Sequence, residues 1–199
     1  MSGAAPGLRW PRHVAGRGRY LADLSIPGAR EAAFLRSPHA HADIVSIDLA
    51  AARAAPGIDA VFLAEDLAAV LQPWRAVHGA FPDMVTPEQT ALAAHLVRHV
   101  GEPVAIVIGE SRAACEDAIE LIDVDYAECP VFADLPTEPA VHPAPIHPEA
   151  PDNLCLDAEK RSPGIEAIFA GADHVVAAAF RFGRHTGIPL EPRGLIAEF

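Results

Sequence analysis

The sequence predicts an α+β protein in which a compact unit of mixed strands and helices is followed by the beginning of a second unit. Three observations predict this organisation. Short apolar or alternating segments and helical segments are mixed along the first 130 residues. A stretch with seven prolines then runs from Pro130 to Pro151, which is typical of an extended, semi-rigid connection. Residues 152–199 carry further strand and helix patterns.

Six strands are predicted in the first unit from apolar segments that turn residues bound: 19–24, 31–37, 42–49, 59–64, 103–109 and 122–126. Segment 42–49 alternates most regularly and predicts that Ile44 and Ile47 point to opposite faces. The segment PVAIVIG at 103–109 is continuously apolar. That pattern favours a strand buried on both faces.

The helices are predicted from caps and from the spacing of apolar residues. Asp48 and the pair Pro56-Gly57 bound a short helix at 48–57, and a helical turn is predicted at 65–71. The clearest helix is 110–122, where Ser111 is a candidate cap. Its predicted buried face comprises Ala114, Ala118, Leu121 and Ile122. Residues 72–90 are expected to form a loop. The later segments predict strands at 153–159, 174–182 and 194–199 and a helix at 164–172.

Composition excludes several classes of function. The net charge of −12 argues against a general nucleic-acid binder, since phosphate contacts need a basic surface. The apolar runs are too short to span a bilayer and the first residues lack an apolar signal segment, so a soluble cytoplasmic protein is expected. One lysine against fourteen arginines indicates a GC-rich bacterial genome. The basic residues 9–19 suit either an acidic partner or a solvated arm.

The first candidate site residues are cysteines, histidines and one glutamate. Cys115, Cys129 and Cys155 form no CxxC pair, so reduced and mostly buried thiols are expected instead of a metal cluster. His39 and His41 share a face of a strand but have no evident partner ligands, which favours a polar turn with surface histidines. Glu102, between a glycine and a proline, is interpreted as a turn carboxylate before a strand. No metal site is therefore predicted.

The most polar segment is GRHTGIPLEPRG, residues 183–194. Glu191 and Arg193 flank a proline, which enforces an extended backbone and fixes the directions of both side chains. Two interpretations remain open from the residues alone. The pair can orient a ligand or a neighbouring loop, or it can be a buried structural ion pair.

Five segments occur in an order that resembles the start of the large, molybdopterin-binding subunit of the molybdenum hydroxylases: GRGRYLADLSIPG, AAFLRSPHAHADIVSIDLAAARAAPGIDAVF, VGEPVAIVIGESRAACEDAIELIDVDY, HPEAPDNLC and RHTGIPLEPRGLIAEF. This is the family of xanthine dehydrogenase, aldehyde oxidase and aerobic carbon monoxide dehydrogenase. The resemblance covers the chain from about residue 14 onward. Within it, the opening LRWPRHVAGRGRY departs from the acidic segment usual in the family.

The resemblance implies a division into four parts. These are an arm at 1–15, an α/β hammerhead domain at 16–130, a Pro-rich linker at 131–151, and an incomplete first molybdenum-cofactor domain at 152–199. It also implies hydroxylation of aldehydes, purines or other heterocycles, or oxidation of carbon monoxide. The implied cofactor is molybdenum-molybdopterin in its cytosine dinucleotide form, held only in a complete assembly. The implied partners are an iron–sulfur subunit and an FAD subunit.

The resemblance further implies that His185, Glu191 and Arg193 lie beside the cofactor. By spacing, His185 stands where xanthine dehydrogenase has a glutamine, so the role of that glutamine does not transfer. The catalytic glutamate and the pterin-binding loops lie downstream in the family, so no catalytic residue is expected here. The isolated chain is expected to be inactive without a complementary chain that carries the remaining cofactor domains. The alternatives are a stand-alone, non-catalytic hammerhead module and a gene fragment without a role.

Overall fold

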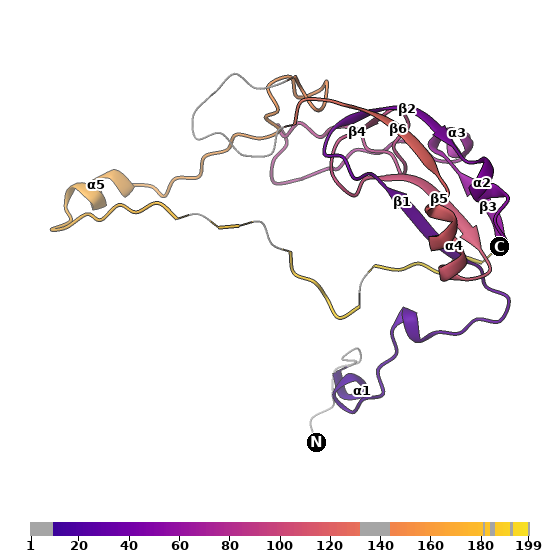
Figure 1. Cartoon of the computed structure of the whole chain (residues 1–199). Helices are drawn as coiled ribbons and strands as arrows, with labels where there is room; N and C mark the ends of the chain where they lie inside the picture. Colours follow the sequence, from indigo (N-terminus) through magenta and orange to yellow (C-terminus); the bar gives the residue numbers. More distant parts are fainter. Residues whose placement is uncertain (1–9, 132–143, 181, 184–185, 192, 199) are drawn as a thin grey trace. The chain divides into compact units, whose positions relative to one another are not determined.

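The structure, a computed structural model, describes residues 10–131, 144–180, 182–183, 186–191 and 193–198. The chain divides into two compact units, one of residues 29–160 and one of residues 1–28 with 161–199. The unit of residues 29–160 contains two small antiparallel sheets with short helices beside them (Figure 1). This arrangement confirms the predicted α+β class.

The first sheet has the strand order β1-β5-β3. It comprises β1 (Glu31–Arg36), β5 (Pro103–Gly109) and β3 (Ile58–Phe62). The continuously apolar β5 lies in the middle and pairs with both neighbours. Its Val104 and Val107 are fully buried, so the predicted two-sided burial is confirmed. Complete burial of a valine side chain contributes about 1.5–3 kcal/mol.

The second sheet has the order β4-β2-β6. It comprises β4 (Leu96–Val97), β2 (Ala42–Asp48) and β6 (Asp123–Glu128). The predicted strands at 42–49 and 122–126 are confirmed. Strand β4 has only two residues and lies in a segment for which no strand was expected. Such a short strand carries too few residues for an alternating pattern.

A β-bulge in β2 changes the predicted faces. The register against β6 shifts between Ile44 and Ser46, so one extra residue is accommodated there. Val45 is consequently 60% exposed, while Ile44 and Ile47 both pack against the same buried cluster. The prediction that these two isoleucines point to opposite faces is therefore wrong, because strict alternation does not continue across a bulge.

Helix α4 (Arg112–Ile119) covers the first sheet and packs against β1 and β5. The Ser111 hydroxyl accepts a hydrogen bond from the third helical N–H at 3.2 Å, which confirms the predicted cap. Cys115 and Ala118 are buried, but Leu121 is 48% exposed. Leu121 was wrongly predicted on the buried face, because the helix ends before this residue.

The other helices of this unit are short. Helix α2 (Ala50–Arg53) begins where the Asp48 carboxylate accepts the Ala50 N–H at 2.9 Å, although the residue at the cap position is Leu49. Helix α3 (Ala64–Leu67) occupies the predicted helical turn after β3. Each of these two helices therefore follows its strand after a single leucine, Leu49 or Leu63.

Two buried clusters make up the core. The first joins the β1-β5-β3 sheet to α2 and α4, and the second lies between the two sheets near β4 and the start of β2. Strand β5 contributes Val107 to the first cluster and Val104 to the second. The buried members are Ala33, Leu49, Ala52, Val61, Val107, Cys115 and Ala118 in one, and Ala42, Ala93, Val97 and Val104 in the other.

The other unit contains α1 (Trp10–Val14), a 3-10 turn η1 (Leu21–Asp23) and α5 (Ile165–Ala170). Helix α5 confirms the predicted helix at 164–172. The described residues of four segments predicted as strands form no β-ladder. A strand is completed only by hydrogen bonds to a neighbouring strand, and apolar sequence alone does not provide that neighbour. These segments are 19–24, 153–159, 174–182 and 194–199.

The described part of the expected linker, residues 144–151, forms turns instead of extended chain. Ala150 N donates to His147 O at 3.0 Å, and Asn153 N donates to Ala150 O at 2.9 Å. These bonds fold the segment back on itself, which the proline count did not indicate.

In the part of the chain that the structure describes, no helix is both long enough and apolar enough to cross a membrane.

Candidate functional site

The structure describes two of the three predicted cofactor-binding residues. His185 lies outside the described residues. One carboxylate oxygen of Glu191 accepts a hydrogen bond from Leu21 N at 2.8 Å, at the start of η1. Gly194 lies against the Leu21 side chain so closely that a Cβ at this glycine would collide with Leu21 Cδ2. The LEPRG segment and the η1 turn are therefore in direct contact.

Glu191 and Arg193 are both exposed. Glu191 orients a neighbouring turn, which was one of the two interpretations open from the sequence. Arg193 lies outside the described helices and strands. A cofactor role for these residues stays a prediction.

The two histidines of the RSPHAHA segment differ in environment. His41 is 6% exposed, and its Nδ1 lies 2.8 Å from Pro130 O. His39 is partly exposed, with its Nδ1 3.3 Å from a Glu128 carboxylate oxygen and its ring 4.8 Å from that of Tyr126. The expectation of surface histidines is thus wrong for His41, which ties the start of β2 to the chain that follows β6.

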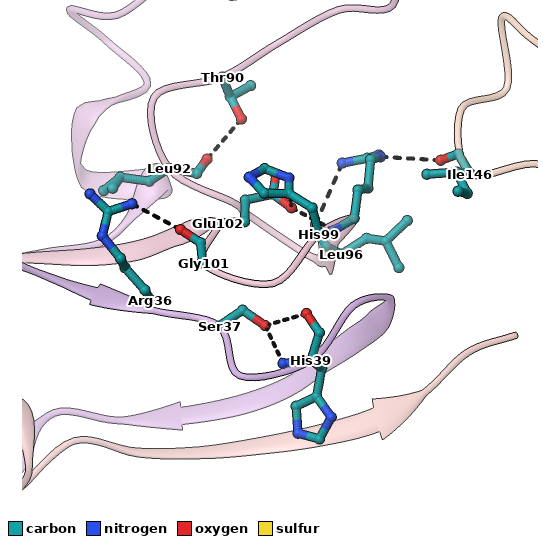
Figure 2. A network of polar contacts seen from close by, with 11 residues as sticks. Arg36, Ser37, His39, Thr90, Leu92, Leu96, His99, Gly101, Glu102 and Ile146 are labelled. Carbon is teal, nitrogen blue, oxygen red and sulfur yellow. Dashed lines mark hydrogen bonds and ion pairs between the residues drawn. The ribbon is translucent and has the colours of Figure 1, made fainter. Parts of the chain in front are cut away.

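Glu102 organises a network of polar contacts at the start of β5, as Figure 2 shows. Its side chain is 16% exposed, accepts a hydrogen bond from Arg98 N at 2.5 Å, and lies 3.6 Å from His99 Nδ1. Gly101 adopts a left-handed φ of 86°, which favours glycine at this turn. The interpretation of Glu102 as a turn carboxylate is confirmed.

Arginines complete this network from outside the turn. Arg36 Nη1 donates to Gly101 O at 2.8 Å, and Arg98 Nε donates to Ile146 O at 3.3 Å (Figure 2). Sequence reasoning missed both arginines. Their partners lie 65 and 48 residues away along the chain, so no local pattern connects them.

Cys115 is a structural residue. It is fully buried and its thiol donates to Glu31 O at 3.5 Å. Burial, with the nearby Glu31 carboxylate as a smaller cause, raises the pKa of the Cys115 thiol above its ordinary value of 9.0. The thiol therefore stays protonated and is a poor nucleophile. Among the described residues, no group of three or more His, Cys, Asp or Glu side chains is arranged to hold a metal ion.

A cavity of about 560 Å³ opens beside β2, between α3 and the chain that leads into β4. Its walls are mainly aliphatic, and the polar side chains among them are Ser46, Glu65, Gln72, Thr90 and His95. The Thr90 hydroxyl is already bonded to Leu92 O at 2.8 Å. No lining residue comes from the described LEPRG segment.

Residues 15–130 match the family model "Aldehyde oxidase and xanthine dehydrogenase, a/b hammerhead domain". This match covers more than half of the chain. The chain belongs to the aldehyde oxidase and xanthine dehydrogenase hammerhead family. The hammerhead residues include both sheets, both buried clusters and the Glu102 turn.

Relatives of the hammerhead chain are named as oxidoreductases. The nicotine 6-hydroxylase large subunit of Paenarthrobacter nicotinovorans is 36% identical over 94% of this chain and 23% of the relative. A putative xanthine dehydrogenase molybdenum-binding subunit of Escherichia coli is 32% identical over 84% of this chain and 22% of the relative. The solved structure of a Cu,Mo-CO dehydrogenase matches with a TM-score of 0.54 and 38% identity, over 64% of this chain and 15% of that chain.

The hammerhead chain spans about a quarter of the length of these curated relatives. Two of the three names include molybdenum. The predicted resemblance to molybdenum hydroxylase large subunits is therefore confirmed.

Proposed function

We propose that this chain is the N-terminal portion of a molybdopterin-dependent oxidoreductase that hydroxylates aldehydes, purines or related heterocycles, or oxidises carbon monoxide. One observation carries the proposal: the alignment to the nicotine 6-hydroxylase large subunit covers 94% of the chain and so extends past the hammerhead residues 15–130. A stand-alone hammerhead domain does not need the segments that follow. The chain works with a complementary chain that carries the remaining cofactor domains.

The proposed assembly has defined parts. The arm at 1–15, the hammerhead at 16–130, the linker at 131–151 and the first part of a cofactor domain at 152–199 come from this chain. An iron–sulfur subunit and an FAD subunit accept the electrons in the cytoplasm. The molybdenum cofactor, in its cytosine dinucleotide form, supplies the oxygen-transfer and electron-accepting chemistry when it is bound.

This chain contributes one polar wall to the cofactor site. The exposed guanidinium of Arg193 suits a phosphate or a polar pterin edge, because its planar donors match such acceptors. One carboxylate oxygen of Glu191 already accepts from Leu21 N, so Glu191 fixes the position of the LEPRG segment. Its second carboxylate oxygen faces the cofactor in the proposed site. His185 completes the proposed set.

The assembly test is co-expression of the 199-residue chain with a chain that carries the rest of a relative's length. We expect a co-purifying complex that reduces a redox dye with at least one substrate from a panel of aldehydes, purines, N-heterocycles and carbon monoxide. The hammerhead chain alone is expected to be inactive in the same assay. Dye reduction by the isolated chain would contradict the need for a partner.

One observation favours the alternative of a stand-alone, non-catalytic module. Residues 29–160 bury two apolar clusters of their own, which is what an independently folding domain requires. The co-expression experiment separates the two functions. A monodisperse hammerhead chain that never co-purifies with the complementary chain supports the module and overturns the proposed enzyme.

A further inference from the structure

The chain that follows residues 132–143 is tied back onto the loops of the same unit. Three contacts join it to segments far away in the sequence. Ile146 O accepts from Arg98 Nε at 3.3 Å, and Cys155 O accepts from Val85 N at 2.8 Å. Between them, a Glu149 carboxylate oxygen lies 3.0 Å from Arg75 Nη2. Residues 144–155, called the strap below, are therefore held at both ends and in the middle.

The strap also has an internal structure. The Asn153 side-chain oxygen accepts from Ile146 N at 2.8 Å and closes a loop over residues 146–153. Asn153 itself has a left-handed φ of 58°, a conformation that asparagine tolerates better than most residues. Ala150, at the centre of this loop, is 3% exposed. The strap therefore contains a closed turn, and the small side chain of Ala150 is buried within it.

Arg75 and Glu149 form the ionic clasp of the strap. Arg75 Nη1 donates to Thr86 O at 2.9 Å, while its Nη2 contacts Glu149 and, at 3.5 Å, Glu88. The same Glu149 oxygen accepts from Glu88 N at 3.4 Å. The side chains of Arg75 and Glu149 are 46% and 33% exposed. A clasp in contact with water is weak enough to open without unfolding the sheets.

The strap belongs to the unit of residues 29–160, called the hammerhead unit below. We propose that it acts as a reversible latch, closed by the Arg75–Glu149 clasp and by Arg98 at Ile146. Its opening frees residues 144–155 from the loops that carry Arg75, Val85 and Arg98. This inference rests on contacts within residues 29–160 and does not depend on the cofactor.

Hydrogen exchange of the 199-residue chain, followed by mass spectrometry, tests the latch. Because the clasp is exposed to water, Glu149→Gln and Arg75→Ala are each expected to speed amide exchange in residues 146–155 about threefold. Exchange in β5 stays unchanged. The matched control is Arg112→Ala, which removes an exposed ion pair to Glu116 of 2.7 Å in α4 and leaves the strap protected.

The outcomes decide the proposal. Unprotected amides at 146–155 in the wild-type chain would show that no strap forms. Equal acceleration in the strap and in β5 would mean global destabilisation and would overturn a local latch. The exchanged pair Arg75→Glu with Glu149→Arg restores the attraction, so its strap is expected to exchange more slowly than in either single charge reversal. Simple addition of the two single effects contradicts the clasp.

Acid is expected to open the strap. Burial first, and then the Arg98 guanidinium, lower the pKa of His147 below its ordinary 6.5; Glu149, Glu102 and His41 also face this ring. The closed strap therefore binds the proton more weakly than the open strap. Its stability is complete above pH 6.5 and falls as the pH drops through the lowered pKa.

Protonation of Glu149 is expected to destabilise the closed strap further at lower pH. Backbone N–H donors, its own and that of Glu88, hold the pKa of this carboxyl below its ordinary 4.5, with Arg75 as a further cause. Exchange at 146–155, relative to an unstructured peptide at each pH, is expected to rise as the pH falls below 6.5, the ordinary pKa of histidine. His147→Gln flattens that rise. A wild-type ratio that does not change with pH contradicts the acid response.

Discussion

Replacement of Gly109 by alanine is expected to lower the free energy of unfolding of the hammerhead unit by about 3 kcal/mol. Gly109 is buried at the end of the central strand β5. A Cβ there would lie 2.5 Å from Gly57 O, 3.0 Å from Ile58 Cδ1 and 3.2 Å from the Cys115 sulfur. The carbonyl cannot simply move away, because it accepts the Glu110 N–H at 2.8 Å.

Urea denaturation followed by far-UV circular dichroism measures this effect. Gly79→Ala is the matched control, because a Cβ at Gly79 meets nothing within 4 Å. The control is expected to change the free energy of unfolding by less than about 0.5 kcal/mol. A similarly small change for Gly109→Ala would contradict the close contact between β5 and the turn before β3.

Removal of the Glu102 carboxylate by Glu102→Ala is expected to reduce the free energy of unfolding by about 2 kcal/mol. The mutation leaves the partly buried Arg98 N without its acceptor at 2.5 Å. It also loosens the turn whose backbone holds the end of β1, where Ser37 N donates to Glu102 O at 2.9 Å and Gly101 N donates to Ser37 O at 2.8 Å.

The Glu102 effect is separated from a general loss of charge by two variants. Glu102→Gln keeps an acceptor oxygen in the turn, so about half of the loss is expected. Glu128→Ala removes a 78% exposed carboxylate and is expected to change the free energy of unfolding by less than about 0.5 kcal/mol. If all three variants unfold at the same urea concentration, Glu102 has no special role in the turn.

Most of the hammerhead fold could be predicted because its strands and helix α4 carry local patterns. Each local pattern indicates the element in which it lies: the continuous apolar run indicates β5, the alternation indicates β2, and the Ser111 cap indicates the start of α4. The bulge at Val45 and the two-residue β4 leave no such pattern. The strands expected at 174–182 and 194–199 are apolar enough, but a ladder needs a neighbour that local sequence does not specify.

The candidate sites were less predictable for a physical reason. Glu102 acts within five residues of its partner, and its role was predicted from the turn alone. Glu191 meets Leu21 across 170 residues, and Arg75 meets Glu149 across 74. Contacts of that range depend on how the whole chain folds, so residue spacing does not reveal them.

The molybdenum content of the purified protein shows whether this chain holds the cofactor alone or only with a complementary chain. We predict that the isolated 199-residue chain contains no stoichiometric molybdenum or pterin by elemental and fluorescence analysis. The complex with a complementary chain is predicted to hold one molybdenum for each copy of this chain. Arg193→Ala is then expected to lower the molybdenum content of the complex, while the two chains remain associated. Stoichiometric molybdenum in the isolated chain, or a stable complex that never binds molybdenum, would contradict the proposed shared cofactor site.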